Sequence, residues 1–299
     1  MKESQMVPQP EFTSYYGRPI IKEPTWKQPD VPLYLFFGGL AGASALLAEG
    51  AELTGRTKLR RVARLAAAAG SSVGSGLLVH DLGRPERFLN MLRVFKVTSP
   101  LSVGSWILAP FSGLAAAAAA SEVTGRLPIP GRLAGVGAGA LGPALATYTA
   151  VLFADTSVPA WHEAHKELPF VFAGSAAAAA GGLAMLATPL DEAGPARRMA
   201  MTGGVVELGA TETMLRRLGM HAEVYQQGRP GFLLKAARAL TTVGVALSPF
   251  GRRSRLVSAV AGASYLGGSV LTRFGVFQAG LASARDPKYT VVPQRERKS

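Results

Sequence analysis

Hydrophobic residues along this chain gather into long apolar runs separated by short polar segments. A helix needs roughly 20 apolar residues to cross a bilayer, and most of these runs approach that length. The pattern therefore predicts an all-α polytopic integral membrane protein with eight transmembrane helices. The predicted helices occupy residues 32–53, 62–80, 101–122, 133–154, 168–188, 199–218, 232–250 and 256–281.

Polar segments flank this membrane domain, which we expect to span residues 32–285. Residues 1–31 form a polar arm and residues 286–299 a basic tail, which leaves no soluble domain. The arm has no apolar core of the kind found in a signal peptide, so we expect no cleavable one. The sixth and seventh helices are the weakest predictions, because charged side chains interrupt them: Glu207, Glu212, Lys235 and Arg238.

One boundary has strong stop signals. Gly83 and Pro85 end the second helix, since glycine accepts a left-handed cap and proline cannot continue the hydrogen-bond ladder. From Arg84 the chain resumes with Phe88, Leu92 and Phe95 on one face of an amphipathic pattern. This predicts a short helix lying on the bilayer surface.

Composition supports a membrane protein. Only 17% of the 299 residues are charged, against about a quarter in soluble domains. The net charge of +13 comes from short basic clusters between apolar runs, which argues against nucleic-acid binding. Basic residues favour neither side, so the positive-inside rule leaves the orientation open. The absence of cysteine excludes disulfides and thiolate-ligated iron–sulfur clusters in this chain.

Polar residues collect at one end of the predicted bundle. Because successive helices alternate in direction, the start of the first helix, the ends of the second and fourth, and the following loop share one side. The residues gathered there are Asp30, Tyr34, His80, Asp81, Thr98-Ser99-Pro100, Tyr148, Asp155, Trp161, His162, Glu163 and His165. Taken singly, each is also explained as an interfacial anchor or a helix cap. Their convergence indicates a site.

Several motifs resemble the NrfD/PsrC family, the membrane subunits of molybdopterin iron–sulfur oxidoreductases. They run in order through the first 190 residues or so, while the last third matches only in helix count and hydropathy. The motifs are Tyr16-Gly-Arg-Pro19, Tyr34-Leu-Phe-Phe-Gly-Gly-Leu-Ala-Gly42, Asp81-Leu-Gly-Arg-Pro-Glu-Arg-Phe88, Thr98-Ser-Pro100, Gly104-Ser-Trp106, Tyr148-Thr-Ala-Val-Leu152 and Val158-Pro-Ala-Trp161.

The resemblance implies two four-helix bundles, about 32–154 and 168–285, in the bacterial inner membrane. It also implies a quinone-reactive anchor without its own redox centre. Such an anchor passes electrons between quinone, with menaquinone favoured over ubiquinone, and a four-cluster ferredoxin-like subunit. That subunit serves a molybdopterin catalytic subunit. The direction of electron flow and the catalytic substrate stay open.

In the family, polar side chains of the first helix and a tyrosine of the fourth hold the quinone head. These positions fall at Asp30, Tyr34 and Tyr148, although the chain lacks the Asn and His pair that some members carry in the first helix. Chemistry adds further quinone-binding candidates. His80 and Asp81 are placed to relay protons to the carbonyl oxygens, and Trp161 is expected to line the mouth of an amphipathic pocket. An alternative is that Asp81 simply pairs with Arg84.

Four carboxylates are candidates for a proton relay: Asp81, Asp155, Glu207 and Glu212. Ionisable residues inside a membrane are costly and usually functional. Two others, Glu49 and Glu52, lie near enough to the end of the first helix to reach water.

Other functions fit less well. Haem needs histidine ligands within spans, and only His80 comes close to one. The pair His162 and His165 lies in a polar loop, where a solvated loop or a partner contact is favoured over zinc. Two rival functions remain open, a proton or solute transporter and a structural membrane anchor that has lost its quinone site. The absence of inverted repeats argues against the transporter.

Overall fold

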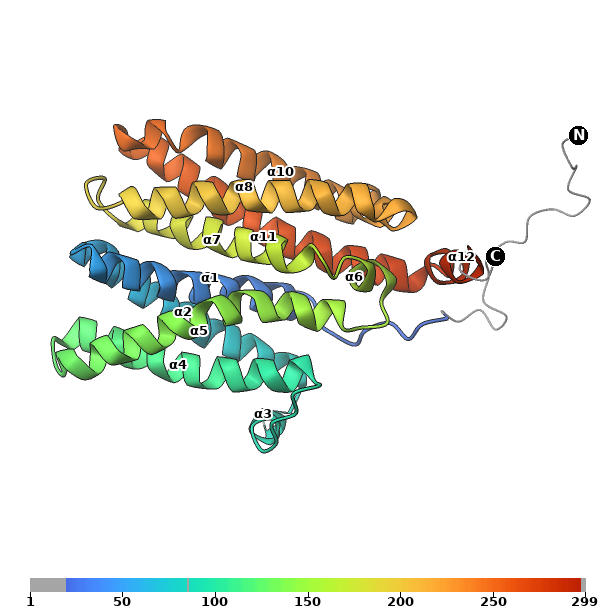
Figure 1. Ribbon diagram of the computed structural model, residues 1–299, viewed down its shortest axis with the longest axis horizontal. Helices are drawn as coiled ribbons and strands as arrows, with labels where there is room; N and C mark the ends of the chain where they lie inside the picture. Colours follow the sequence, from blue (N-terminus) through green and yellow to red (C-terminus); the bar gives the residue numbers. More distant parts are fainter. Residues whose placement is uncertain (1–19, 85, 297–299) are drawn as a thin grey trace, which may run out of the picture.

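The computed structural model describes residues 20–84 and 86–296. Within these ranges the chain is helical and contains no strand, so the predicted all-α class is confirmed. The long helices lie side by side along one axis (Figure 1). They are α1 (Asp30–Leu53), α2 (Thr57–Leu82), α4 (Pro100–Thr124), α5 (Pro128–Ala154), α7 (Leu168–Ala187), α8 (Gly194–Arg217), α10 (Gly228–Leu247) and α11 (Arg255–Arg285).

Local sequence signals account for the helix ends, which lie within about five residues of the predicted ones. Helix α2 ends at Gly83 with φ +71°, the left-handed cap predicted from the sequence. Gly125 ends α4 in the same way, with φ +66°. At the start of α4, Ser99 is the N-cap and Pro100 follows at the first helical position, where its missing N–H costs nothing.

Five of the long helices are long and apolar enough to cross a membrane: α1, α2, α4, α5 and α7. The chain is therefore a membrane protein with several apolar helices. The remaining three long helices, α8, α10 and α11, lack such an apolar stretch because charged side chains such as Glu207, Lys235 and Arg273 interrupt them.

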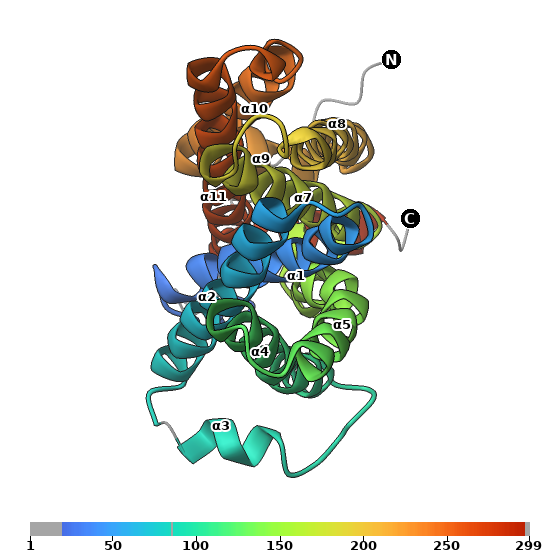
Figure 2. The same cartoon turned by 90° about the vertical axis from the view of Figure 1, so that its left-hand side faces the viewer.

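Helix α1 is the most enclosed of these five candidate spans. It packs on α2 and α5, and α4 closes this group by contacting α2 and α5. Helices α7, α8, α10 and α11 form a neighbouring group, which meets the first mainly where α1 and α5 contact α7 (Figure 2). The α1–α5 crossing is very close, because a Cβ at Gly42 or Gly142 would collide with the backbone of the other helix. Small residues allow such approach in membrane helices.

The short helix that follows α2 differs from the prediction. The helix predicted from Arg84 through Phe95 is wrong in length, since α3 covers only Glu86–Met91. The chain then leaves helical geometry because Ser102 Oγ binds it back to α4, accepting from Lys96 N (3.0 Å) and donating to Val94 O (3.0 Å). As a result, α3 projects sideways from the first group (Figure 2).

The C-terminal segment is more ordered than a polar tail, since it contains α12 (Lys288–Glu296). Tyr289 of this helix is buried beside His221, whose Nε2 lies 3.1 Å from Tyr289 O. An aromatic cluster joins the two helix groups at the same end of the molecule. Trp161, on α6 (Pro159–Glu163), stacks with Trp26 and Phe153 at 5.6 and 4.2 Å between ring centroids, and those two rings also stack with each other at 5.4 Å.

Candidate functional site

The starts of α1, α4, α7 and α10 and the ends of α2, α5, α8 and α11 share one end of the molecule, called the polar end below (Figure 1). This places all the residues predicted to converge there on the same side. The motif Tyr16-Gly-Arg-Pro19 lies outside the described residues.

A cavity of about 560 Å³ opens at the polar end, between the start of α4, the end of α5 and the loop that carries α6. Its volume lies within the range of small-molecule sites, about 300–1,000 Å³. The wall is apolar at Pro100 and Val103, and it carries the polar groups of Tyr148 and Asp155. The other lining residues are Val97, Thr98, Val151, Ala154, His162 and His165.

Tyr148 occupies its position because Gly104 leaves room for it. A Cβ on Gly104 would collide with the Tyr148 ring, so the ring lies flat against the backbone of α4. The tyrosine is buried yet lines the cavity. A phenol in this position offers one O–H donor to a ligand.

Asp155 and two histidines supply the other polar groups of the cavity. Asp155 is the residue that ends α5. His162 Nδ1 lies 3.0 Å from Ala154 O, and His165 Nδ1 lies 2.9 Å from His162 O. The sequence places these histidines in the loop on the same side as Tyr148, but it does not indicate that they share a cavity with that residue.

Three predicted residues form a separate cluster at the α1 and α2 ends. His80 Nδ1 donates to Asp30 Oδ2 at 2.7 Å, and Asp81 Oδ1 accepts from Lys27 N at 2.8 Å. Within the described residues Asp81 forms no ion pair with Arg84. This cluster does not line the cavity.

Tyr34 and Trp161 are core residues. Tyr34 is buried one turn below Asp30. Trp161 is fully buried and donates from Nε1 to Val276 O at 2.8 Å, and Gly280 accommodates its indole. The expected place of Trp161 at a pocket mouth is therefore corrected: it packs in the aromatic cluster.

The two carboxylates of α8 have different surroundings. Glu207 is buried, and its oxygens accept from Thr272 Oγ1 at 2.7 Å and Thr241 Oγ1 at 3.4 Å. Glu212 is partly exposed, with 41% of its side chain accessible, and pairs with Arg216 and Arg238.

Beside Thr272, Arg273 is completely buried. Its Nη2 donates to Phe172 O at 2.9 Å, and its guanidinium lies 3.7 Å above the Phe172 ring. A buried glutamate and a buried arginine thus occur close together in the second helix group.

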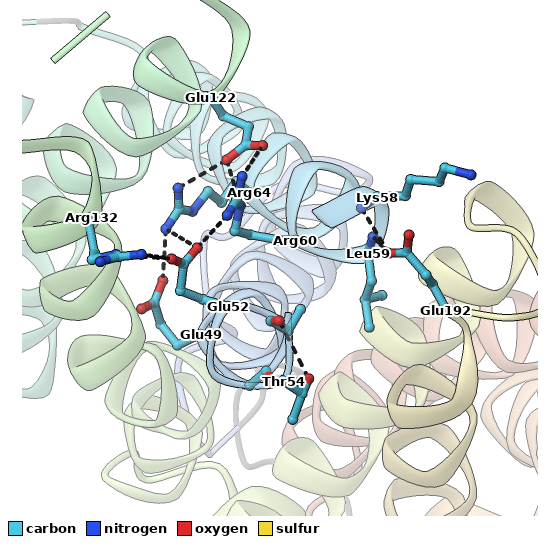
Figure 3. Close-up of polar contacts among 12 residues, drawn as sticks. Glu49, Glu52, Thr54, Lys58, Leu59, Arg60, Arg64, Glu122, Arg132 and Glu192 are labelled. Carbon is cyan, nitrogen blue, oxygen red and sulfur yellow. Dashed lines mark hydrogen bonds and ion pairs between the residues drawn. The ribbon is translucent and has the colours of Figure 1, made fainter. Parts of the chain in front are cut away.

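The opposite end of the first helix group holds an ion-pair network (Figure 3). Arg60 bridges Glu52 at 2.7 Å and Glu122 at 2.9 Å, and Arg64 reaches the same Glu122 at 3.0 Å. Arg132 closes the network on Glu52 at 2.6 Å. The carboxylate of Glu52 is held by these arginines, and 12% of its side chain is exposed.

Glu49 joins this network through Arg64, at 3.5 Å. Three glutamates and three arginines are then present, so their formal charges cancel. A small cavity borders the network, but the arginines that line it are already paired. We therefore assign this end a structural role.

A further ion pair connects the α6 loop to the end of α8. Glu167 accepts from Arg217 Nε and Nη2, both at 2.6 Å. These hydrogen bonds from the guanidinium hold the pKa of the Glu167 carboxyl below its ordinary value. The loop that carries His162 and His165 is thereby fastened to the second helix group.

Across the described ranges, no group of three or more His, Cys, Asp or Glu side chains is arranged to hold a metal ion. The fold and the site define a helical membrane protein with a ligand-sized cavity at one end of its helices.

Comparison with known protein families finds a match to the first part of the chain. The family described as Polysulphide reductase, NrfD matches residues 23–128, which confirms the resemblance predicted from the motifs over that region. The match covers α1 to α4, including Gly104, while Tyr148 lies beyond it. NrfD proteins are membrane subunits of quinone-linked oxidoreductases. A search of curated proteins finds no match.

Proposed function

We propose that this protein is the quinone-reactive membrane anchor of a respiratory oxidoreductase, and that quinone binds in the cavity beside Tyr148. The observation that carries the proposal is the placement of a buried tyrosine on a largely apolar cavity at the polar end. The NrfD match over residues 23–128 supports the same class of function.

The chemistry of a quinone suits this cavity. Its ring is apolar and fits against Pro100, Val103 and Val151, whereas its carbonyl oxygens need hydrogen-bond donors. Tyr148 supplies one donor. Five other residues were also predicted to bind quinone: Asp30, Tyr34, His80, Asp81 and Trp161. None of them lines the cavity, so Tyr148 is the principal residue of the proposal.

The electrons must come from another subunit, since the chain contains no cysteine for an iron–sulfur cluster. We infer that a four-cluster ferredoxin-like subunit docks on the polar end and connects the quinone to a molybdopterin catalytic subunit. Menaquinone is the favoured quinone.

We further propose that all eight long helices span a bacterial inner membrane as two four-helix bundles, residues 32–154 and 168–285. Glu207 of α8 and Arg273 of α11 would then lie within the protein, whereas Arg238 of α10 is exposed and pairs with Glu212 of α8. The buried positions of Glu207 and Arg273 agree with this placement.

A proton relay completes the proposal. Asp155 borders the cavity and Glu207 is surrounded by hydroxyls, so these two carboxylates are better placed for proton transfer than Glu212, which pairs with arginines on the surface. Asp81 lies in the separate cluster with Lys27.

The test is Tyr148→Phe in the assembled complex. Losing one hydrogen bond to the quinone is worth about 1.4 kcal/mol, so we expect quinone turnover to fall about tenfold with assembly unchanged. Tyr265→Phe is the control, because Tyr265 bonds to Ser248 in the other helix group. Unchanged quinone kinetics in Tyr148→Phe would remove Tyr148 from the site.

Two alternatives are separated by a mild-detergent pull-down with quinone extraction. Cysteine-rich and molybdopterin partners are expected with the tagged protein, and bound quinone is expected to accompany them. Partners without quinone would indicate a structural anchor. An intact protein without either would favour a proton or solute transporter that uses Glu207.

A further inference from the structure

Two imidazoles border the cavity beside Tyr148, and both come from the loop that carries α6. Their ring centroids are 6.0 Å apart. Each ring is tied by Nδ1 to a backbone oxygen, that of Ala154 for His162 and that of His162 for His165. The tethers orient both rings, although both residues are exposed.

These contacts define the tautomer of each neutral ring. A backbone carbonyl can only accept a hydrogen bond, so Nδ1 must carry the proton and donate it. The lone pair of the neutral ring then lies on Nε2, the atom that takes up and releases a proton. Both rings therefore keep one nitrogen for structure and the other for proton exchange.

We propose that His162 and His165 carry protons between the quinone in the cavity and water at the polar end, His162 first and His165 next along the loop. This inference rests on the proposed function. In quinone reduction the docked iron–sulfur subunit supplies two electrons, and each carbonyl oxygen gains one proton. His162 Nε2–H gives a proton to the reduced oxygen, breaking its N–H bond as the O–H bond forms. Water reloads the ring through His165 before the second transfer, and quinol oxidation runs the same steps backwards.

The alternative role of His162 is purely structural. Its bond to Ala154 O satisfies a carbonyl at the C-terminal end of α5, as a helix cap does. That role needs only the Nδ1–H donor, whereas proton exchange needs Nε2. The two roles can therefore be separated by a side chain that keeps the first nitrogen and lacks the second.

Asparagine is such a side chain, since its amide nitrogen can replace Nδ1 as the donor to Ala154 O. The experiment compares His162→Asn and His165→Asn, singly and together, in the assembled complex. Quinone binding is followed by photoaffinity labelling and quinone turnover is assayed with and without added imidazole. The control is His221→Asn, because His221 contacts Tyr289 far along the chain and does not line the cavity.

General acid–base groups contribute about 10²–10⁴-fold to a rate. We expect turnover to fall about a hundredfold in each single variant and no further in the double variant, because the two rings are successive links of one relay. Quinone binding should stay within about twofold, and imidazole should restore part of the turnover. The His221→Asn complex should behave as wild type.

Full turnover in the double variant would overturn the inference, and so would lost turnover that imidazole fails to restore, which indicates a structural role. If one variant does not assemble, the other single variant decides by the same criteria. Absence of quinone labelling in the wild-type cavity would instead overturn the proposed function, so the two failures are distinguishable.

Discussion

At the scale of residues, the site depends on one glycine and the tyrosine packed on it. Gly104 lies in a motif that resembles the NrfD family and within the region that the family matches, and its lack of a side chain lets the ring of Tyr148 lie against α4. The motif thus has a physical explanation: it shapes the cavity without contributing a polar group of its own.

Replacing Gly104 with alanine should displace Tyr148, since the new Cβ would overlap the ring. We expect quinone turnover to fall at least about tenfold, because small displacements of a positioned group are costly in rate. The measurement is turnover at saturating quinone. The control is Gly113→Ala on the same helix, where a Cβ meets nothing within 4 Å; equal behaviour of the two variants would refute the role assigned to Gly104.

A second prediction concerns the charge network of Figure 3. Glu122 has only 8% of its side chain exposed and holds both Arg60 and Arg64. Glu122→Gln should lower the free energy of unfolding by about 2–3 kcal/mol, since a buried arginine loses its paired charge. Denaturant unfolding in detergent measures this loss.

Its control is Glu212→Gln, which breaks an exposed pair and should change stability little. Equal free energies of unfolding for the two variants would contradict the prediction, because the network would then contribute no more to stability than an exposed ion pair.

Sequence patterns located the site residues along the chain but not their neighbours. Periodicity places Asp30, His80 and Tyr148 at the same end, and this is correct. Which of them meet depends on helix rotation and on the choice of neighbouring helices, so Asp30 pairs with His80 while Tyr148 faces the α6 loop. That His162 and His165 line the same cavity as Tyr148 follows only from the way that loop folds against α5.

At the scale of elements, the apolar runs predicted all eight long helices, because each run must bury or shield its backbone as a helix. Short elements were less predictable. Helix α3 stops at Met91, and the chain beyond it is bound by Ser102, which lies 16 residues after the start of the helix. Tyr289 of helix α12 is buried against His221, and a contact between residues so far apart in the chain cannot be predicted from the local sequence pattern.

The α6 loop is anchored by the ion pair of Glu167 with Arg217, and this gives a pH prediction. Because the pKa of Glu167 is lowered in the fold, the carboxylate contributes its full stabilisation above its ordinary value, about 4.3. It loses that contribution as the pH falls through the lowered pKa.

The melting temperature of the wild-type protein should therefore exceed that of Glu167→Gln at pH 7, and the two should converge below about pH 4. Thermal melts in detergent across this range provide the measurement. A gap that persists unchanged at acidic pH would show that the ion pair is not its source.

At the scale of the whole molecule, the proposal requires that all eight long helices cross the membrane, although only five are clearly apolar. The chain contains no cysteine, so single introduced cysteines report their own side of the membrane. With eight spans, Lys166→Cys and Gln227→Cys should react with an impermeant maleimide from one side. Arg126→Cys and Arg253→Cys should react from the other. If Gln227→Cys reacted from the same side of the membrane as Arg126→Cys, α8 would not cross it.

The most direct test of the account is to locate the quinone itself. A photoreactive quinone is added to membranes containing the complex, and the labelled peptides are mapped with and without excess native quinone. The account predicts competed labels within residues 97–103, 148–155 and 162–165, the walls of the cavity. Competed labels confined to the Asp30–His80 cluster or to the opposite end, with none in these three segments, would contradict it.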